Sequence, residues 1–158
     1  MDPRPLMAVD PGAARSGWVW VRPDGVVAAH GDDDNLMVRD LLREWGSDVV
    51  IEYTKPRGQP ASMALFDTLM WTGRFIEAAG REVILILGSE VRRHLCGNPS
   101  AKDAAVHTVL WDRFGGSMKG AKGTKDKPGP LYGFSGNDEY DALALAITYI
   151  DKKNEVKP

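Results

Sequence analysis

Short apolar runs separated by turn signals predict three strands at the start of the chain. The runs cover residues 6–9, 18–21 and 26–29. An Asp-Pro-Gly turn at 10–12 follows the first run, and Pro23-Asp24-Gly25 separates the second from the third. Gly and Pro at these places end strands and reverse the chain, so we expect the three strands to pair as an antiparallel meander.

The rest of the chain alternates between short apolar runs and segments with helical spacing. Residues 48–52 and 82–87 suit buried parallel strands. Helices are predicted over about 35–45, over 62–79, from 89, over 100–114, and from 137 or 138 to about 152. This order predicts an α/β fold. Its five-stranded mixed sheet has three antiparallel and then two parallel strands, with helices on both faces.

Composition fits one globular domain. The 158 residues are 43% hydrophobic and 27% charged, so a single domain over 1–158 is expected. No apolar run is long enough for a bilayer span, and the N-terminus lacks the features of a secretory signal. The single cysteine, Cys96, has no partner for an internal disulfide. We therefore expect a protein of the reducing cytoplasm, without a membrane partner.

The net charge of −2 does not by itself indicate a nucleic-acid partner, but its distribution is uneven. Residues 1–116 have 13 Lys or Arg and 16 Asp or Glu, whereas the Gly-rich segment 117–136 has four lysines and one acid. We expect a basic loop over 115–136 that becomes ordered when it binds phosphates. The alternative is a solvated surface insertion. The lysines of this segment are Lys119, Lys122, Lys125 and Lys127.

Four acids stand where a metal site would form. Asp10 and Glu52 each end an apolar strand, and Asp138 and Asp141 share one face at the start of the last helix. Taken singly, Asp10 could serve its turn, and the two helix acids could serve the helix dipole. Clustered carboxylates repel one another, so a divalent cation favours the arrangement, and Mg²⁺ or Mn²⁺ prefers oxygen ligands. Two such ions can hydrolyse a phosphodiester.

These motifs resemble those of the RuvC Holliday junction resolvases, which have a ribonuclease H-like fold. The matching features are Asp10-Pro11-Gly12 with Gly17 downstream, Val50-Ile51-Glu52, and Asp138 to Asp141 before an Ala/Leu run. The resemblance spans nearly the whole chain in order. It implies that the four acids hold two Mg²⁺ or Mn²⁺ ions per site. It also implies a homodimer that nicks four-way DNA junctions.

Several other residues are candidates for contact with DNA. Arg92, Arg93 and Lys102 lie where the family binds phosphate. Lys55 and Arg57 flank Glu52 in sequence, and Tyr53 has a ring that could stack on an unpaired base. For Phe66 and Trp71, packing in the core or between subunits is the favoured role. The segment 53–60 is richer in Pro and Gly than the corresponding segment of the RuvC family. The aromatic residue with which family members contact the junction bases therefore has no counterpart here.

Three other functions are alternatives to a junction resolvase. A broader nuclease would cut flaps, three-way junctions or RNA–DNA hybrids with the same metal chemistry. An actin-like or sugar-kinase ATPase needs a second domain, for which 158 residues are too few. A catalytically inactive junction-binding protein would have no need of four acids. The broader nuclease therefore remains the main alternative.

Overall fold

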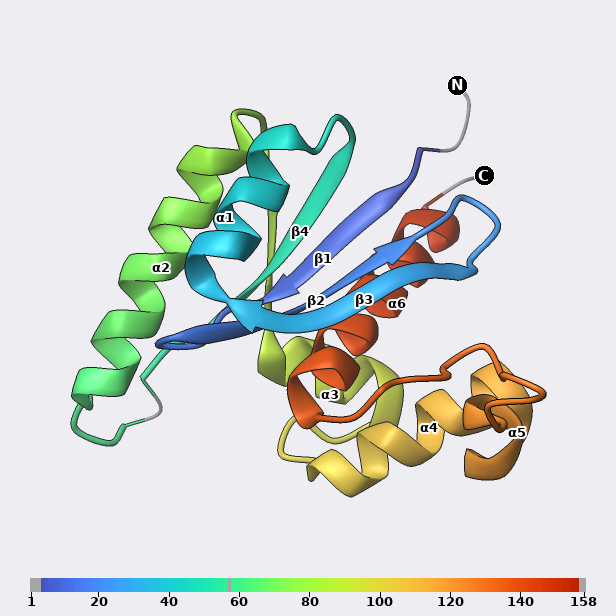
Figure 1. Ribbon diagram of the computed structural model, residues 1–158. Coiled ribbons are helices and arrows are strands. Elements are labelled where there is room, and N and C mark those ends of the chain that lie inside the picture. Colours follow the sequence, from blue (N-terminus) through green and yellow to red (C-terminus); the bar gives the residue numbers. More distant parts are fainter. Residues whose placement is uncertain (1–3, 57, 157–158) are drawn as a thin grey trace.

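A five-stranded mixed sheet lies at the centre of the molecule (Figure 1). The structure is a computed structural model that describes residues 4–56 and 58–156. The strand order is β3-β2-β1-β4-β5, with β1–β2 and β2–β3 antiparallel and β1–β4 and β4–β5 parallel. The strands are β1 (Leu6–Asp10), β2 (Arg15–Val21), β3 (Val27–Asp34), β4 (Asp48–Tyr53) and β5 (Ile84–Leu87). The predicted fold class is confirmed.

Helices cover both faces of the sheet, as Figure 1 shows. Successive residues of a strand point to opposite faces, so Leu6 and Ala8 of β1 join one core and Met7 and Val9 join the other. The core around Met7 and Val9 includes α1 (Asn35–Glu44) and α2 (Met63–Ala79). The core around Leu6 and Ala8 includes α3 (Gly88–Cys96), α4 (Asp103–Gly115) and α6 (Asn137–Glu155).

The last helix, α6, is the central element of its layer. Residues 142–148 are all buried, so this stretch is enclosed on every side rather than along one stripe. Ala142, Ala144 and Ala146 are small, which lets the helix lie close to the sheet. Because α6 packs over β1 and β2, its first turns lie at the end of the sheet where β1 finishes.

The segment 115–136 differs from the loop that the sequence predicts. It contains a short helix, α5 (Met118–Lys122), and Ala121 and Leu131 are completely buried. The backbone N–H of Leu131 donates to the carbonyl of Ala121 over 2.7 Å. A Cβ on Gly115 or Gly120 would lie 2.2 Å from backbone atoms, so these glycines permit the tight turn. The prediction of a loop over 115–136 is therefore wrong for Met118–Lys122, and the segment packs into the core through Ala121 and Leu131.

No helix within residues 4–56 and 58–156 is both long and apolar enough to cross a membrane.

Candidate metal centre

Three carboxylates meet at the end of β1. Asp10 is the last residue of β1, while Asp138 and Asp141 lie in the first turns of α6. One oxygen from each lies within 4.8 Å of the others. Asp10 and Asp138 are 128 residues apart in sequence but are brought together by the packing of α6 on β1. The structure thus brings three of the four expected acids into one cluster.

Glu52 lies beside this cluster. It sits in β4, which runs parallel to β1, and its charge acts on Asp10. A Cβ on Gly88, at the start of α3, would be 2.5 Å from Glu52 Oε1, so only glycine leaves the carboxylate this space. Glu52 also lines a pocket of about 140 Å³ together with Tyr53 and Lys55. The fourth acid therefore forms the border between the carboxylate cluster and this pocket.

The carboxylates hold their protons more tightly than ordinary acids. Burial raises the pKa of Asp10 well above its usual value, and the charges of Glu52, Asp141 and Asp138 raise it further. Burial also raises the pKa of Asp141 to about 6 and raises that of Asp138. Since each ionised form is unfavourable, the cluster fits a hard divalent cation that would compensate the negative charge.

Arg92 is the cation on the rim of this cluster. Its guanidinium donates to the carbonyl of Ala101 over 2.6 Å and to Asp103 Oδ1 over 2.8 Å, and it lies 3.8 Å from Asp141. Asp103 in turn accepts a bond from Asn137 Nδ2 over 3.2 Å. Asp103 is the first residue of α4, and no sequence pattern indicated a role for it in the site. The structure shows that it links α3, α4 and α6 next to the carboxylates.

A buried polar network holds the turn after Asp10. Ser16 Oγ accepts from the backbone N–H of Gly12 and donates to Asn35 Oδ1, over 3.1 and 2.6 Å. Asn35 Nδ2 donates to the carbonyl of Gly12 over 2.9 Å, which closes the ring. Ser16 and Asn35 are almost completely buried. An isolated Ser and an isolated Asn carry no distinctive sequence pattern, so these two residues could not be predicted as part of the site.

Gly17 fixes the position of α6 relative to the sheet. A Cβ at this residue would lie 2.1 Å from the carbonyl oxygen of Asp138 and 2.2 Å from its carbonyl carbon. Backbone is in contact with backbone here, so a larger residue would have to displace the start of α6. This contact gives a physical reason for the glycine that follows the Asp-Pro-Gly turn.

The expected DNA-contacting residues are spread over several places. Arg93, Lys102 and Lys55 are exposed, and Tyr53 is half-buried beside Glu52. Arg57 lies outside the described residues. Apart from Arg92, the remaining candidates are lysines of residues 115–136, called the α5 segment from here on. This segment packs at the C-terminal end of α4 (Figure 1). Of these, Lys119, Lys125 and Lys127 are exposed and Lys122 is partly buried.

The sheet order and the helices on both faces match the ribonuclease H-like fold. In particular, the chain shares the fold of solved RuvC structures. The structure of Thermus thermophilus RuvC matches it with a TM-score of 0.66 and 17% identity over 96% of each chain. T. thermophilus RuvC in complex with a Holliday junction substrate matches with a TM-score of 0.64 and 15% identity, again over 96% of each chain. No protein-family model and no curated protein sequence matches this chain.

Proposed function

We propose that this protein is a metal-dependent endonuclease that nicks Holliday junctions. The observation that carries the proposal is the meeting of Asp10, Asp138 and Asp141 beside Glu52, at the end of β1 in a RuvC-type fold. A structure with this fold was solved with a Holliday junction substrate bound, which supports branched DNA as the ligand. The carboxylates support hydrolysis of its phosphodiester bonds.

In this mechanism Asp10, Glu52, Asp138 and Asp141 would hold two Mg²⁺ or Mn²⁺ ions. Such ions, when bound, activate water and stabilise the leaving oxygen of the phosphodiester. The chain's own task is to present ionised, fixed carboxylates. Burial opposes ionisation of Asp141, while the nearby Arg92 favours it by lowering the pKa of that acid. The network of Gly12, Ser16 and Asn35 keeps the backbone after Asp10 in place.

A panel of DNA substrates tests this function. The purified protein is incubated with synthetic four-way, three-way, flap and linear duplex DNA, with Mg²⁺ or Mn²⁺, and the nicks are mapped. Paired symmetric nicks in the four-way junction are expected, with little cutting of linear duplex. Equal cutting of every branched substrate would favour the broader nuclease instead. Absence of cleavage with either metal would reject both.

The basic residues away from the carboxylates are proposed to bind the DNA backbone. Phosphate contacts need only charge and reach, which the exposed Arg93 and Lys102 have. Changing all four lysines of the α5 segment to Gln should weaken junction binding and flatten its salt dependence, because each lost phosphate contact lowers the slope by about 0.9. An Arg39→Gln/Arg43→Gln variant on α1 is the control. Equal affinity and slope in the lysine variant and the wild-type protein would exclude this segment from the DNA surface.

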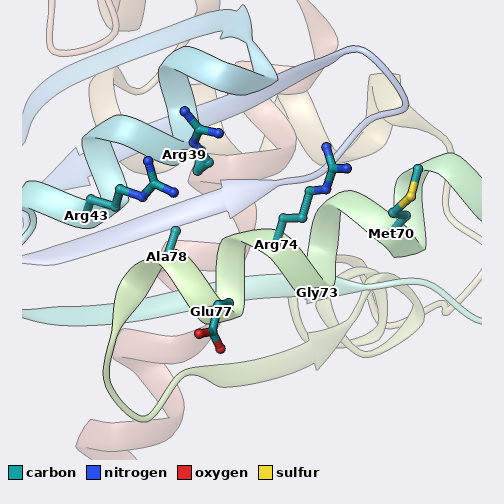
Figure 2. Close-up of a pocket in the computed structure, with 7 residues that line it drawn as sticks. All are labelled: Arg39, Arg43, Met70, Gly73, Arg74, Glu77 and Ala78. Atoms are coloured by element: carbon teal, nitrogen blue, oxygen red, sulfur yellow. The ribbon is translucent and has the colours of Figure 1, made fainter.

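A homodimer is proposed because a four-way junction has two symmetric cleavage positions, whereas residues 4–56 and 58–156 contain one such carboxylate cluster. The exposed apolar residues of α2 lie three and four positions apart and form a stripe: Met63, Phe66 and Met70, which are 74%, 55% and 51% exposed. Phe75, further along the same helix, is buried in the core. Next to Met70, a groove of about 720 Å³ between α1 and α2 is lined by Arg39, Arg43 and Arg74 (Figure 2).

We expect sedimentation at micromolar concentration to give a dimer for the wild-type protein and a monomer for Phe66→Glu/Met70→Glu. Two carboxylates placed in an apolar interface would be desolvated without partners, which strongly opposes association. Met118→Glu, at an equally exposed position on α5, is the control and should remain dimeric. A wild-type protein that is monomeric even with junction DNA would refute the dimer.

A further inference from the structure

His30 of β3 lies between two hydrogen-bond acceptors. Its Nδ1 is 2.7 Å from Glu139 Oε1, and its Nε2 is 3.1 Å from the carbonyl oxygen of Tyr132. The carbonyl can only accept. The imidazole ring therefore bridges the carboxylate of Glu139 and the backbone carbonyl of Tyr132.

The same glutamate holds the start of α6. Its second oxygen, Oε2, accepts from the backbone N–H of Ser135 over 2.8 Å and from that of Gly136 over 3.4 Å. These donors immediately precede the helix, and the Glu139 side chain is only 5% exposed. One carboxylate thus connects the edge strand β3 with the first turn of α6, over a separation of 109 residues.

The chain that enters α6 is wrapped around the His30 ring. The ring stacks on Phe134 with centroids 4.1 Å apart. Gly133 has a φ of +84°, and a Cβ built on it would be 3.4 Å from His30 Cε1. Residues 132–134 therefore contact the imidazole through a carbonyl, a glycine and an aromatic ring. Removal of the ring would therefore remove contacts that hold the segment leading into α6.

The residues next to Glu139 are the ones that matter for the metal centre. Asp138 precedes it and Asp141 follows within one turn, so a shift of this turn moves both carboxylates. Metal ligands depend on such supporting partners, and removing one typically weakens metal affinity by about 10–100-fold. Gly17 limits movement toward β2, whereas His30 and Glu139 hold the helix start from β3.

We propose that His30 is a positioning residue of the metal centre. Its bonds to Glu139 and Tyr132 fix the start of α6, so that Asp138 and Asp141 stay in place to bind the ions. This inference rests on the proposed function, since it assumes that the carboxylate cluster binds metal.

The test is His30→Gln, whose amide presents an oxygen in place of one of the two ring nitrogens and so cannot keep both contacts. Mn²⁺ binding is measured by calorimetry without DNA, and the Mg²⁺ dependence of junction cleavage is measured alongside. We expect the Mn²⁺ dissociation constant and the Mg²⁺ concentration for half-maximal rate to rise about tenfold or more. At saturating metal the rate should approach that of the wild-type protein. A residue that only stabilised the fold would reduce the folded fraction without changing the metal affinity of the folded protein.

His94→Gln is the matched control. His94 is also 21% exposed and bonds a carboxylate on α6, Asp151, over 2.8 Å. Asp151 is ten residues beyond Asp141, about 15 Å along the helix, so this variant should bind metal normally. Equal Mn²⁺ affinity in His30→Gln and His94→Gln would overturn the proposal. A wild-type protein that binds no Mn²⁺ would overturn both the proposal and the proposed function. A wild-type protein that binds Mn²⁺ but cuts no DNA would overturn the function alone, and the metal titration would still decide the role of His30.

Discussion

The Asp10→Asn variant is expected to lose cleavage by at least about 10²–10³-fold, while its affinity for junction DNA stays measurable. Asp10 interacts with all three of the other acids. It belongs to the cluster with Asp138 and Asp141, and the charge of Glu52 raises its pKa. Removing a single preorganised electrostatic group from an active site commonly has an effect of this size. Single-turnover cleavage of a four-way junction with saturating Mg²⁺ is the measurement. Cutting at the wild-type rate would show that the metal centre is misassigned.

The same substitution should stabilise the metal-free protein. The pKa of Asp10 is higher in the folded protein than in the unfolded chain, so its ionisation destabilises the fold as pH rises. For Asp141 the pH range of this effect follows from its pKa, which folding raises from 3.8 to about 6. The protonated carboxyl stabilises the folded protein below about pH 4, and this contribution, about 3 kcal/mol, is lost as the pH rises through about 6. Without metal at pH 8, Asp10→Asn should therefore unfold at a higher temperature than the wild-type protein.

With metal added, the wild-type protein should instead unfold at a higher temperature than Asp10→Asn. Mg²⁺ or Mn²⁺ that binds only the folded protein raises the wild-type unfolding temperature, and the variant should respond much less. Asp112→Asn, an exposed acid on α4, is the control and should behave as the wild-type protein does. A metal-induced shift in Asp10→Asn as large as in the wild-type protein would contradict the assignment of Asp10 as a ligand.

Gly17→Ala is expected to have the second-largest effect. The added methyl would lie 2.1 Å from the Asp138 carbonyl oxygen, and neither backbone can move freely. We expect a loss of about 1–3 kcal/mol in the free energy of unfolding, as for other overpacked sites. Cleavage should fall about 10²-fold, because a displacement of about 1 Å at a catalytic group has that effect. Chemical denaturation and single-turnover cleavage measure the two quantities.

Gly46→Ala is the control that distinguishes the effect of the Gly17–Asp138 contact from the effect of replacing any glycine by alanine. Neither Gly17 nor Gly46 has a positive φ, so alanine suits the backbone at both positions, and a Cβ on Gly46 would meet no atom within 4 Å. Gly46→Ala should fold and cleave as the wild-type protein does. A Gly17→Ala variant with the stability and activity of Gly46→Ala would show that α6 does not need this contact.

Local sequence patterns predicted most of the elements because they depend on neighbouring residues. The alternation in β1 and the cap at Asp34, which accepts from the backbone N–H of Leu36 over 2.9 Å, are examples. The end of β3 was not predicted. This strand continues to Asp34 because β2 pairs with it over its whole length, from Arg15 opposite Asp34 to Val21 opposite Val27. The acidic residues 32–34 look like a helix start in sequence, and only the partner strand makes them part of the sheet.

The segment 115–136 shows the same limit for packing. Its glycines and lysines are typical of a flexible loop, yet Ala121 and Leu131 are buried in the core that α4 and α6 build. Two apolar residues among many polar ones give no periodic signal. Their burial depends on a surface supplied by other elements.

The sequence by itself determined the order and type of the main elements and the positions of four acids at strand ends and a helix start. It could do so because periodicity, caps and turns are short-range properties. Only the tertiary structure decided how those acids are held: by the backbone contact between Gly17 and Asp138, by Arg92 with Asp103, and by His30 with Glu139. Each of these contacts joins segments far apart in the chain. Their energies depend on distance and burial, which no local pattern of residues records.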